Sequence, residues 1–141
     1  MEMNLNNLQN IASEIIKKVK KINREGASVI TLHGDLGAGK TTLTQEIARQ
    51  FKVKVNIISP TFVIMKKYEV IDKEFKYLIH IDAYRLEKSE ELFKLGWQEL
   101  IENKNNLIII EWPENVPDCI PKDVLKIEIS HINENTRTIK F

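Results

Sequence analysis

A glycine-rich segment carries the residues of this sequence that are best suited to chemistry. It reads Gly34-Asp35-Leu36-Gly37-Ala38-Gly39-Lys40-Thr41 and fits the pattern G-x-x-x-x-G-K-[ST]. Glycines allow such a loop to turn several backbone N–H groups toward one anion, and a helix that begins there adds the positive end of its dipole. Lys40 could then contact the outer phosphates of a nucleotide, and the Thr41 hydroxyl could ligate Mg²⁺. The residues expected to bind the nucleotide here are Asp35, Leu36, Gly37, Ala38, Gly39, Lys40, Thr41 and Thr42.

Two predicted strands end in a carboxylate, and nucleotide hydrolysis needs a second contact to Mg²⁺ and a group that positions the attacking water. Residues 107–110 form an apolar run that places Glu111 at the carboxyl edge of the sheet, where ligands bind in open α/β sheets. Strand alternation places His80 and Asp82 together on one face of another strand. Lys40, Asp82 and Glu111 are therefore the predicted catalytic residues, with Thr41 and Glu111 at the metal. The alternatives are acids that merely end a strand at the surface, and a His80 that is a packed, hydrogen-bonded residue.

Three further side chains are candidates for the same site, and two of them, Trp112 and Arg85, also have an ordinary structural alternative. Thr61 follows Pro60, where a switch threonine could sense the terminal phosphate. Trp112 follows Glu111 and could line the nucleotide site or belong to the core. Arg85 could neutralise phosphate charge or hold a loop through a salt bridge.

The elements that must position these residues can be predicted from the pattern of apolar residues. Apolar residues from Leu5 to Ile22 recur at spacings of three and four, which predicts an amphipathic helix that Gly26 ends. A buried strand at 29–32 should precede the glycine-rich loop, and a helix at 40–51 should follow it. The further predicted elements are a strand at 53–58, an antiparallel hairpin of 62–70 with 75–81, a helix after Ser89 interrupted at Gly96, a turn at 103–106, a strand at 107–110, a proline-rich loop and strands at 124–130 and 136–141.

Strands that alternate with helices predict an α/β fold. We expect a P-loop NTPase-like three-layer sandwich with a mixed central sheet and flanking helices. The length of 141 residues predicts a single domain over residues 1–141.

Composition narrows the setting in which the chain acts. It has no apolar run of the ~18 residues that a membrane span needs and no pattern of a secretory signal, and Cys119 is its only cysteine. These features predict a cytoplasmic protein without a disulfide. A net charge of +1, from 21 Lys and Arg against 20 Asp and Glu, argues against binding DNA or RNA through bulk charge. A local cluster at Lys17, Lys18, Lys20, Lys21 and Arg24 is interpreted as a solvated helix face, with an acidic partner or nucleic acid as the alternative.

Together these motifs resemble the TsaE (YjeE) family of small bacterial P-loop ATPases, in order and over nearly the whole chain. The matching strings are Gly34 to Thr42, Ser59-Pro60-Thr61-Phe62, His80-x-Asp82-x-Tyr84-Arg85-Leu86, Glu91-Leu92, Leu95-Gly96 and Ile110-Glu111-Trp112-Pro113-Glu114. The glycine-rich loop is shared by many families, whereas the other strings in this order are much more specific. Val63 departs from the family, in which a threonine is common at that position.

The resemblance implies a role in making threonylcarbamoyladenosine (t6A) in tRNA. It implies slow hydrolysis of ATP that is stimulated when the chain joins the TsaD and TsaB proteins, with tRNA reached indirectly through that complex. It also places residues 59–62 in a first switch, Asp82 in a second switch, Glu111 at Mg²⁺ and Trp112 near the nucleotide. Arg137 is the candidate for an arginine that closes on the nucleotide, and residues 4–8 should border the adenine.

Other readings of the glycine-rich loop stay open at this point. A small-molecule kinase is one, although the stretch after Ser59 is interpreted as a hairpin rather than an arginine-rich lid. A GTPase is less favoured, because Asn103-Lys104-Asn105-Asn106 lacks the aspartate of a guanine-reading motif. A nucleotide-dependent interaction module without turnover is a third reading, against which Lys40, Thr41 and Glu111 argue.

Overall fold

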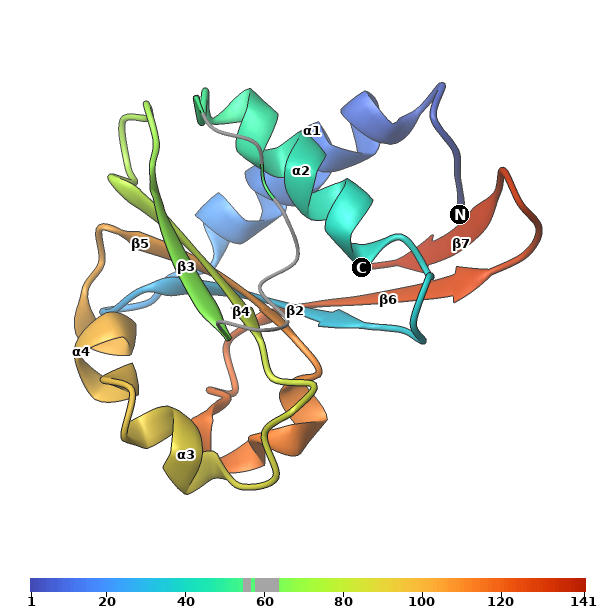
Figure 1. The fold of residues 1–141 in the computed structure, drawn as a ribbon. Coiled ribbons are helices and arrows are strands. Elements are labelled where there is room, and N and C mark those ends of the chain that lie inside the picture. The colour runs from blue at the N-terminus through green and yellow to red at the C-terminus, as the bar shows by residue number, and fades with distance from the viewer. Residues whose placement is uncertain (55–56, 58–63) are drawn as a thin grey trace.

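Among the residues that the structure describes, seven strands form a mixed sheet with helices on both sides (Figure 1). The computed structural model describes residues 1–54, 57 and 64–141. In chain order its elements are β1 (Glu2–Met3), α1 (Leu8–Lys21), β2 (Ser28–His33), α2 (Lys40–Gln50), β3 (Met65–Glu69), β4 (Tyr77–Asp82), α3 (Ser89–Phe93), α4 (Trp97–Glu102), β5 (Asn106–Glu111), the 3₁₀ turns η1 (Pro113–Asn115) and η2 (Pro117–Cys119), β6 (Leu125–His131) and β7 (Arg137–Lys140). The α/β class predicted from the sequence is therefore confirmed.

The strands lie in the order β1-β7-β6-β2-β5-β4-β3. β2 runs parallel to both of its neighbours, β5 and β6, and β4 runs parallel to β5. The pairs β3–β4, β6–β7 and β1–β7 are antiparallel, so the predicted hairpin before and after residues 71–74 is confirmed. The carboxyl ends of β2, β4 and β5 consequently meet at one edge of the sheet.

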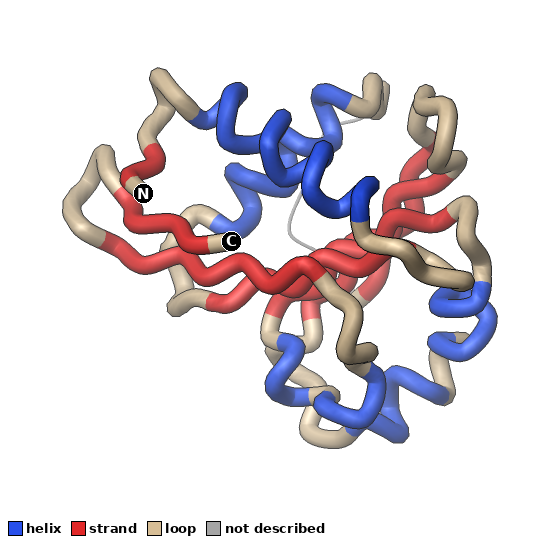
Figure 2. Tube along the Cα trace, turned by 180° about the vertical axis from the view of Figure 1, so that it is seen from behind, coloured by secondary structure: helices blue, strands red, loops and turns tan. Residues whose placement is uncertain are grey.

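Each face of the sheet has its own hydrophobic core. Helices α1 and α2 cover one face, where Ile15 and Leu43 pack with Leu78 and Ile109. The short helices α3 and α4 cover the other face, and Trp97 is buried there. The view from behind shows the strands as one twisted layer between the two groups of helices (Figure 2). Because β5 is buried on both faces, its run of isoleucines needs no polar alternation.

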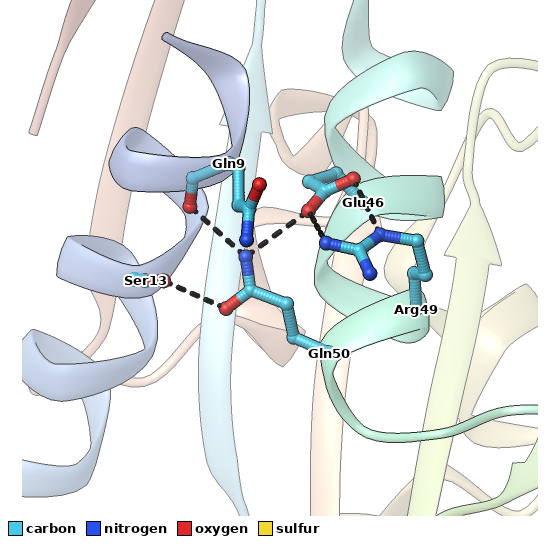
Figure 3. A network of polar contacts seen from close by, with 5 residues as sticks. All are labelled: Gln9, Ser13, Glu46, Arg49 and Gln50. Atoms are coloured by element: carbon cyan, nitrogen blue, oxygen red, sulfur yellow. Dashed lines mark hydrogen bonds and ion pairs between the residues drawn. The ribbon is translucent and has the colours of Figure 1, made fainter.

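A small polar network joins the two helices that cover the first face (Figure 3). The Gln50 side-chain amide donates to the backbone oxygen of Gln9 at 2.9 Å and to Glu46 Oε1 at 3.1 Å. Ser13 Oγ donates to Gln50 Oε1 at 2.9 Å. The hydrogen bond from Arg49 lowers the pKa of the Glu46 carboxyl, which therefore stays ionised as the acceptor in this network. α2, which begins at the glycine-rich loop, is thus fixed to α1.

Several predicted boundaries differ from the structure. α1 ends at Lys21 rather than at Gly26, because Ile22 already has an extended backbone, and Leu5 lies before the helix and is exposed. Residues 53, 54 and 57 of the predicted strand at 53–58 lie outside any strand, and the rest of that segment lies outside the described residues. Asn106, the last residue of the predicted turn at 103–106, is instead the first residue of β5. The two-residue strand β1 was not predicted, because two residues show no alternation.

No helix in the described part of the chain is long and apolar enough to cross a membrane.

Candidate phosphate-binding site

The glycine-rich loop occupies the connection between β2 and α2, as the sequence pattern requires. Gly39 is the residue before α2 and has a φ of 104°, a left-handed conformation that a side chain would disfavour. Gly34 begins the loop, and a Cβ atom there would lie 2.5 Å from the backbone oxygen of Ile129. The loop can therefore pass close to β6 and then turn directly into the amino end of α2. That helix end is a favourable place for an anion.

The side chain of Lys40 contacts the backbone of the glycine-rich loop that precedes it. The residue is 5% exposed, its Nζ donates a hydrogen bond to the backbone oxygen of Gly34, and Nζ lies 4.1 Å from the centroid of the Trp112 ring. Burial lowers the pKa of the Lys40 ammonium, while the nearby carboxylates of Glu111 and Asp82 act to raise it. A carbonyl oxygen, an aromatic ring and two acids thus surround the cation.

The two acids predicted to share the site are opposite each other in neighbouring strands. Asp82 ends β4 and Glu111 ends β5, and these parallel strands pair the two residues directly. They are 6% and 3% exposed. Asp82 Oδ1 accepts a hydrogen bond from the backbone of Tyr84 at 3.0 Å, and Glu111 Oε2 lies 2.7 Å from Nε2 of His80. His80 is fully buried, so its interpretation as a packed, hydrogen-bonded residue is confirmed.

One cavity of about 280 Å³ connects these groups. Four segments far apart in the sequence contribute to it, namely the glycine-rich loop with the start of α2, the end of β4, the end of β5 and the start of β7. Its lining residues are Leu36, Gly37, Gly39, Lys40, Thr41, Thr42, Asp82, Glu111, Trp112 and Arg137. The structure therefore brings together most of the candidate residues that the sequence singled out.

Some candidates lie elsewhere. Asp35 is exposed and faces a separate hollow beside His33 and Ser130, so its side chain does not reach the cavity. Ala38 is buried behind the loop. Arg85 is exposed and does not line the cavity. Thr61 lies outside the described residues.

Arg137 contacts the glycine-rich loop from the side. Its Nε donates to the backbone oxygen of Ala38 at 3.1 Å, its Nη2 lies 3.4 Å from the oxygen of Gly37, and its Nη1 donates to the oxygen of Asn133 at 2.6 Å. The guanidinium group therefore joins β7 and the turn before it to the loop. The sequence suggested Arg137 as a residue near the nucleotide, but it gave no indication of these carbonyl contacts.

A second cavity, of about 450 Å³, adjoins the first and shares Gly39, Thr42 and Arg137 with it. Residues 4–6 and Leu8 line it, which is where the family resemblance places the adenine. Its other lining residues were missed by sequence reasoning, and they are Met3, Glu134 and Asn135. No local motif marks them, because they reach the cavity only through the pairing of β1 with β7 and the turn that precedes β7.

Trp112 has an unusual backbone for a large residue. Its φ is 57°, in the left-handed region, and it directly follows the last residue of β5. Its ring centroid lies 5.1 Å from that of Tyr84, in addition to its contact with Lys40. Trp112 thus lines the cavity and also packs, partly buried, against the core on the face that α3 and α4 cover.

The donor set suits Mg²⁺ better than a metal held by protein alone. No group of three His, Cys, Asp or Glu side chains that could hold a metal is present among the described residues. Two carboxylates and the Thr41 hydroxyl border the cavity instead. Mg²⁺ is commonly held by one or two carboxylates together with substrate phosphates, so these residues fit the ion when a nucleotide is present.

The fold and the cavity define an α/β protein in which a glycine-rich loop and two strand-end acids meet at the carboxyl edge of a mixed sheet. The family model described as "Threonylcarbamoyl adenosine biosynthesis protein TsaE" matches residues 3–139. The chain belongs to the TsaE family, as its motifs indicated.

Individual relatives support the same family. The chain is similar to the tRNA threonylcarbamoyladenosine biosynthesis protein TsaE of Bacillus subtilis, at 33% identity over 129 residues, 92% of this chain and 78% of the relative. The protein of that name from Rickettsia felis is 36% identical over 110 residues, 77% of this chain but only 61% of the relative's length. Among solved structures, the crystal structure of YdiB from Bacillus subtilis matches with a TM-score of 0.66 and 27% identity, covering 99% of this chain and 82% of that one.

Proposed function

We propose that this chain is the ATP-binding and ATP-hydrolysing component of the machinery that makes t6A in tRNA. In this proposal it works in the cytoplasm as one domain, 1–141, with a P-loop NTPase-like three-layer sandwich fold. The observation that carries the proposal is the single cavity bordered by Lys40, Thr41, Asp82 and Glu111. Membership of a family named for threonylcarbamoyladenosine biosynthesis supports the pathway.

The residues around the cavity divide the work of ATP hydrolysis. Backbone N–H groups of the glycine-rich loop and the Lys40 ammonium hold the phosphates, which would replace the Gly34 oxygen as the partner of that ammonium. Thr41 and Glu111 hold Mg²⁺, and Asp82 or Glu111 orients the attacking water. When bound, Mg²⁺ neutralises negative charge on the phosphate oxygens. Most of the rate enhancement then comes from positioning and electrostatics.

Three further residues complete the proposed nucleotide site. Trp112 borders the phosphates through its ring, and Arg137 holds the loop in shape and faces both cavities. Thr61, outside the described residues, is proposed to sense the terminal phosphate. The segment around it would report the nucleotide state to the TsaD–TsaB pair, and tRNA would be reached only through that pair.

The test is ATP hydrolysis by the purified chain, alone and together with TsaD and TsaB, with Lys40→Ala and Glu111→Ala as variants. We expect slow hydrolysis by the chain alone and strong stimulation by the pair, both lost in the two variants. Lys67→Ala is the matched control, because Lys67 lies over Tyr77 at 3.9 Å and does not border the cavity. Absence of any association with TsaD and TsaB would contradict the proposed partnership.

The same assay decides between hydrolysis and a kinase reaction. Hydrolysis releases free phosphate in the absence of any acceptor, whereas a kinase transfers it to a hydroxyl or amine. The antiparallel pair β3 and β4 follows the glycine-rich loop and α2 in the chain, and this hairpin is the feature that argues against a kinase lid. Formation of ADP together with a phosphorylated small-molecule acceptor, without release of free phosphate, would favour the kinase and contradict the proposal.

A further inference from the structure

The fully buried ring of His80 contacts one of the acids of the candidate site, and the proposed function leaves this contact without a role. Nε2 of His80 lies 2.7 Å from Oε2 of Glu111, and the two side chains are 0% and 4% exposed. We propose that His80 is a positioning residue that fixes the Glu111 carboxylate in the orientation that Mg²⁺–nucleotide needs. The inference rests on the proposed function, since it concerns the same site.

The strand register explains how a histidine can reach this acid. β4 and β5 are parallel, and Asp82 pairs with Glu111 while His80 pairs with Ile109. Side chains two residues apart in a strand share a face, so all three polar groups project toward the face that α2 covers. His80 lies one step behind the acids, deeper in the core. Its ring therefore reaches forward along the sheet to Glu111 and not into the cavity, which it does not line.

The hydrogen bond leaves one carboxylate oxygen for the cavity. Oε2 is engaged by His80, and Glu111 borders the cavity, so Oε1 is the carboxylate oxygen left for a cation there. A carboxylate held at one oxygen cannot rotate freely, so less ordering is needed when a cation binds the other oxygen. Partners of metal ligands commonly act in this way, and their loss typically lowers metal affinity about 10- to 100-fold.

The other ring nitrogen indicates which nitrogen carries the hydrogen. Nδ1 of His80 is buried and has no hydrogen-bond partner among the described residues. A neutral ring with its hydrogen on Nε2 donates to Glu111 and leaves Nδ1 as an unpaired acceptor, whereas a hydrogen on Nδ1 would be a buried donor without an acceptor. Buried unpaired groups are costly, and an N–H without an acceptor is the rarer case in folded proteins. The geometry therefore assigns His80 as donor and Glu111 as acceptor.

Two substitutions separate positioning from packing. His80→Gln keeps an N–H donor near the place of Nε2, whereas His80→Leu fills similar space without a donor. The measurement is the affinity for a non-hydrolysable ATP analogue by calorimetry, with Mg²⁺ and with a chelator in its place. The ratio of the two dissociation constants isolates the contribution of Mg²⁺, and a purely structural defect would weaken binding in both buffers alike. Unfolding curves for each variant show that the compared proteins are folded.

We expect His80→Leu to reduce the gain from Mg²⁺ by about tenfold or more and to keep the affinity measured with chelator. His80→Gln should recover most of that gain. If His80 acts through Glu111, adding His80→Leu to Glu111→Ala should cause no further loss. A gain from Mg²⁺ that is unchanged in His80→Leu, or a further loss in the double variant, would overturn the inference. Failure of the unmodified chain to bind the analogue in either buffer would instead contradict the proposed function itself.

Discussion

The Nζ atom of Lys40 lies 4.1 Å from the centroid of the Trp112 ring, so the cation of the glycine-rich loop and the aromatic residue after β5 meet across the candidate site. A cation over an indole face is attracted by the quadrupole of the neutral ring, by about 0.5–2 kcal/mol according to the exposure of the pair. A bound phosphate would compete with both the ring and the Gly34 oxygen for this ammonium. The surroundings of the Trp112 ring would therefore change when a phosphate binds the Lys40 ammonium.

Replacing Lys40 by alanine should weaken the binding of ATP much more than the binding of AMP, because the lysine is proposed to contact the outer phosphates, which AMP lacks. Loss of a hydrogen bond to a charged group costs about 1.5–3 kcal/mol, which corresponds to a loss of about 10- to 100-fold in ATP affinity. Titration calorimetry with both nucleotides measures the difference, and Lys67→Ala serves as the control. Equal weakening of ATP and AMP would show that Lys40 supports the fold of the loop rather than the phosphates.

Replacing Arg137 by lysine should loosen the glycine-rich loop although the charge is kept. The guanidinium contacts the oxygens of Gly37 and Ala38 at once, and an ammonium on a flexible stem cannot reproduce that fork. We expect faster amide exchange over residues 36–41 and a loss of about 3- to 10-fold in nucleotide affinity, the size of effect that a lost neutral hydrogen bond has. Hydrogen exchange and calorimetry measure the two effects. Arg49→Lys, on an exposed side of α2, is the control, and exchange rates equal to those of the unmodified chain would count against this role.

The contribution of Asp72 to stability should depend on pH. Burial alone would raise the pKa of this carboxyl, but the hydrogen bond from Lys20 at 2.7 Å and those from the backbone of Glu74 and Phe75 lower it below its usual value of 3.8. A carboxyl whose pKa is lowered in the folded state stabilises the protein at pH values above its pKa in the unfolded chain. That contribution is lost as the pH falls through the lowered pKa of the folded state. Asp72→Asn should therefore destabilise the chain by about 1 kcal/mol at neutral pH and by progressively less below about pH 4.

Urea unfolding at several pH values measures this effect. The difference between the unmodified chain and the variant is the relevant quantity, because other acids titrate in both proteins. Glu74→Gln is a suitable control, since the Glu74 backbone rather than its side chain donates to Asp72. A difference that stays constant from neutral to acid pH would show that Asp72 acts through its shape and not through its charge.

The Gln50 network should couple α1 to α2 energetically. Gln50→Ala removes the bonds to Gln9 and Glu46 as well as the one to Ser13, so it should cost about 1–2 kcal/mol of unfolding free energy. A double-mutant cycle with Ser13→Ala should give a coupling energy of about 0.5–1 kcal/mol. Gln98→Ala is the matched control, because the Gln98 amide donates within α4, to Glu102. Additive effects of the Ser13 and Gln50 substitutions would rule out the coupling.

Local sequence signals were sufficient for the elements that carry the glycine-rich loop. The apolar run before Gly34 and the 3.6-residue pattern after Lys40 predicted β2 and α2 to within two residues at each end. The isoleucine run before Glu111 predicted β5 for the same reason, since a strand buried on both faces has a distinctive composition. These features depend on residues next to one another, which is the information that a single sequence contains.

Features that depend on distant pairing could not be predicted in this way. His80 and Glu111 are 31 positions apart in the chain. Their contact could be predicted only if it were known that β4 lies beside β5. The contacts of Arg137 with the loop, and the approach of Glu134 and Asn135 to the second cavity, depend on β7 pairing with both β1 and β6. The strand predicted from Val53 is absent at its described residues, because apolar alternation over so short a stretch does not by itself secure a partner strand.

The position of β2 between β5 and β6 also bears on how the protein acquires its structure. β2 spans residues 28–33, yet both of its partners come after residue 105, so each parallel pairing closes a long segment of chain before it gains any contact. Loop closure of this kind slows folding, and topologies rich in distant pairing fold more slowly than those built from local contacts. The glycine-rich loop follows β2 directly and packs on β6 at Gly34. We therefore expect its binding-competent shape to emerge late in folding, only after the sequence beyond β5 has joined the sheet.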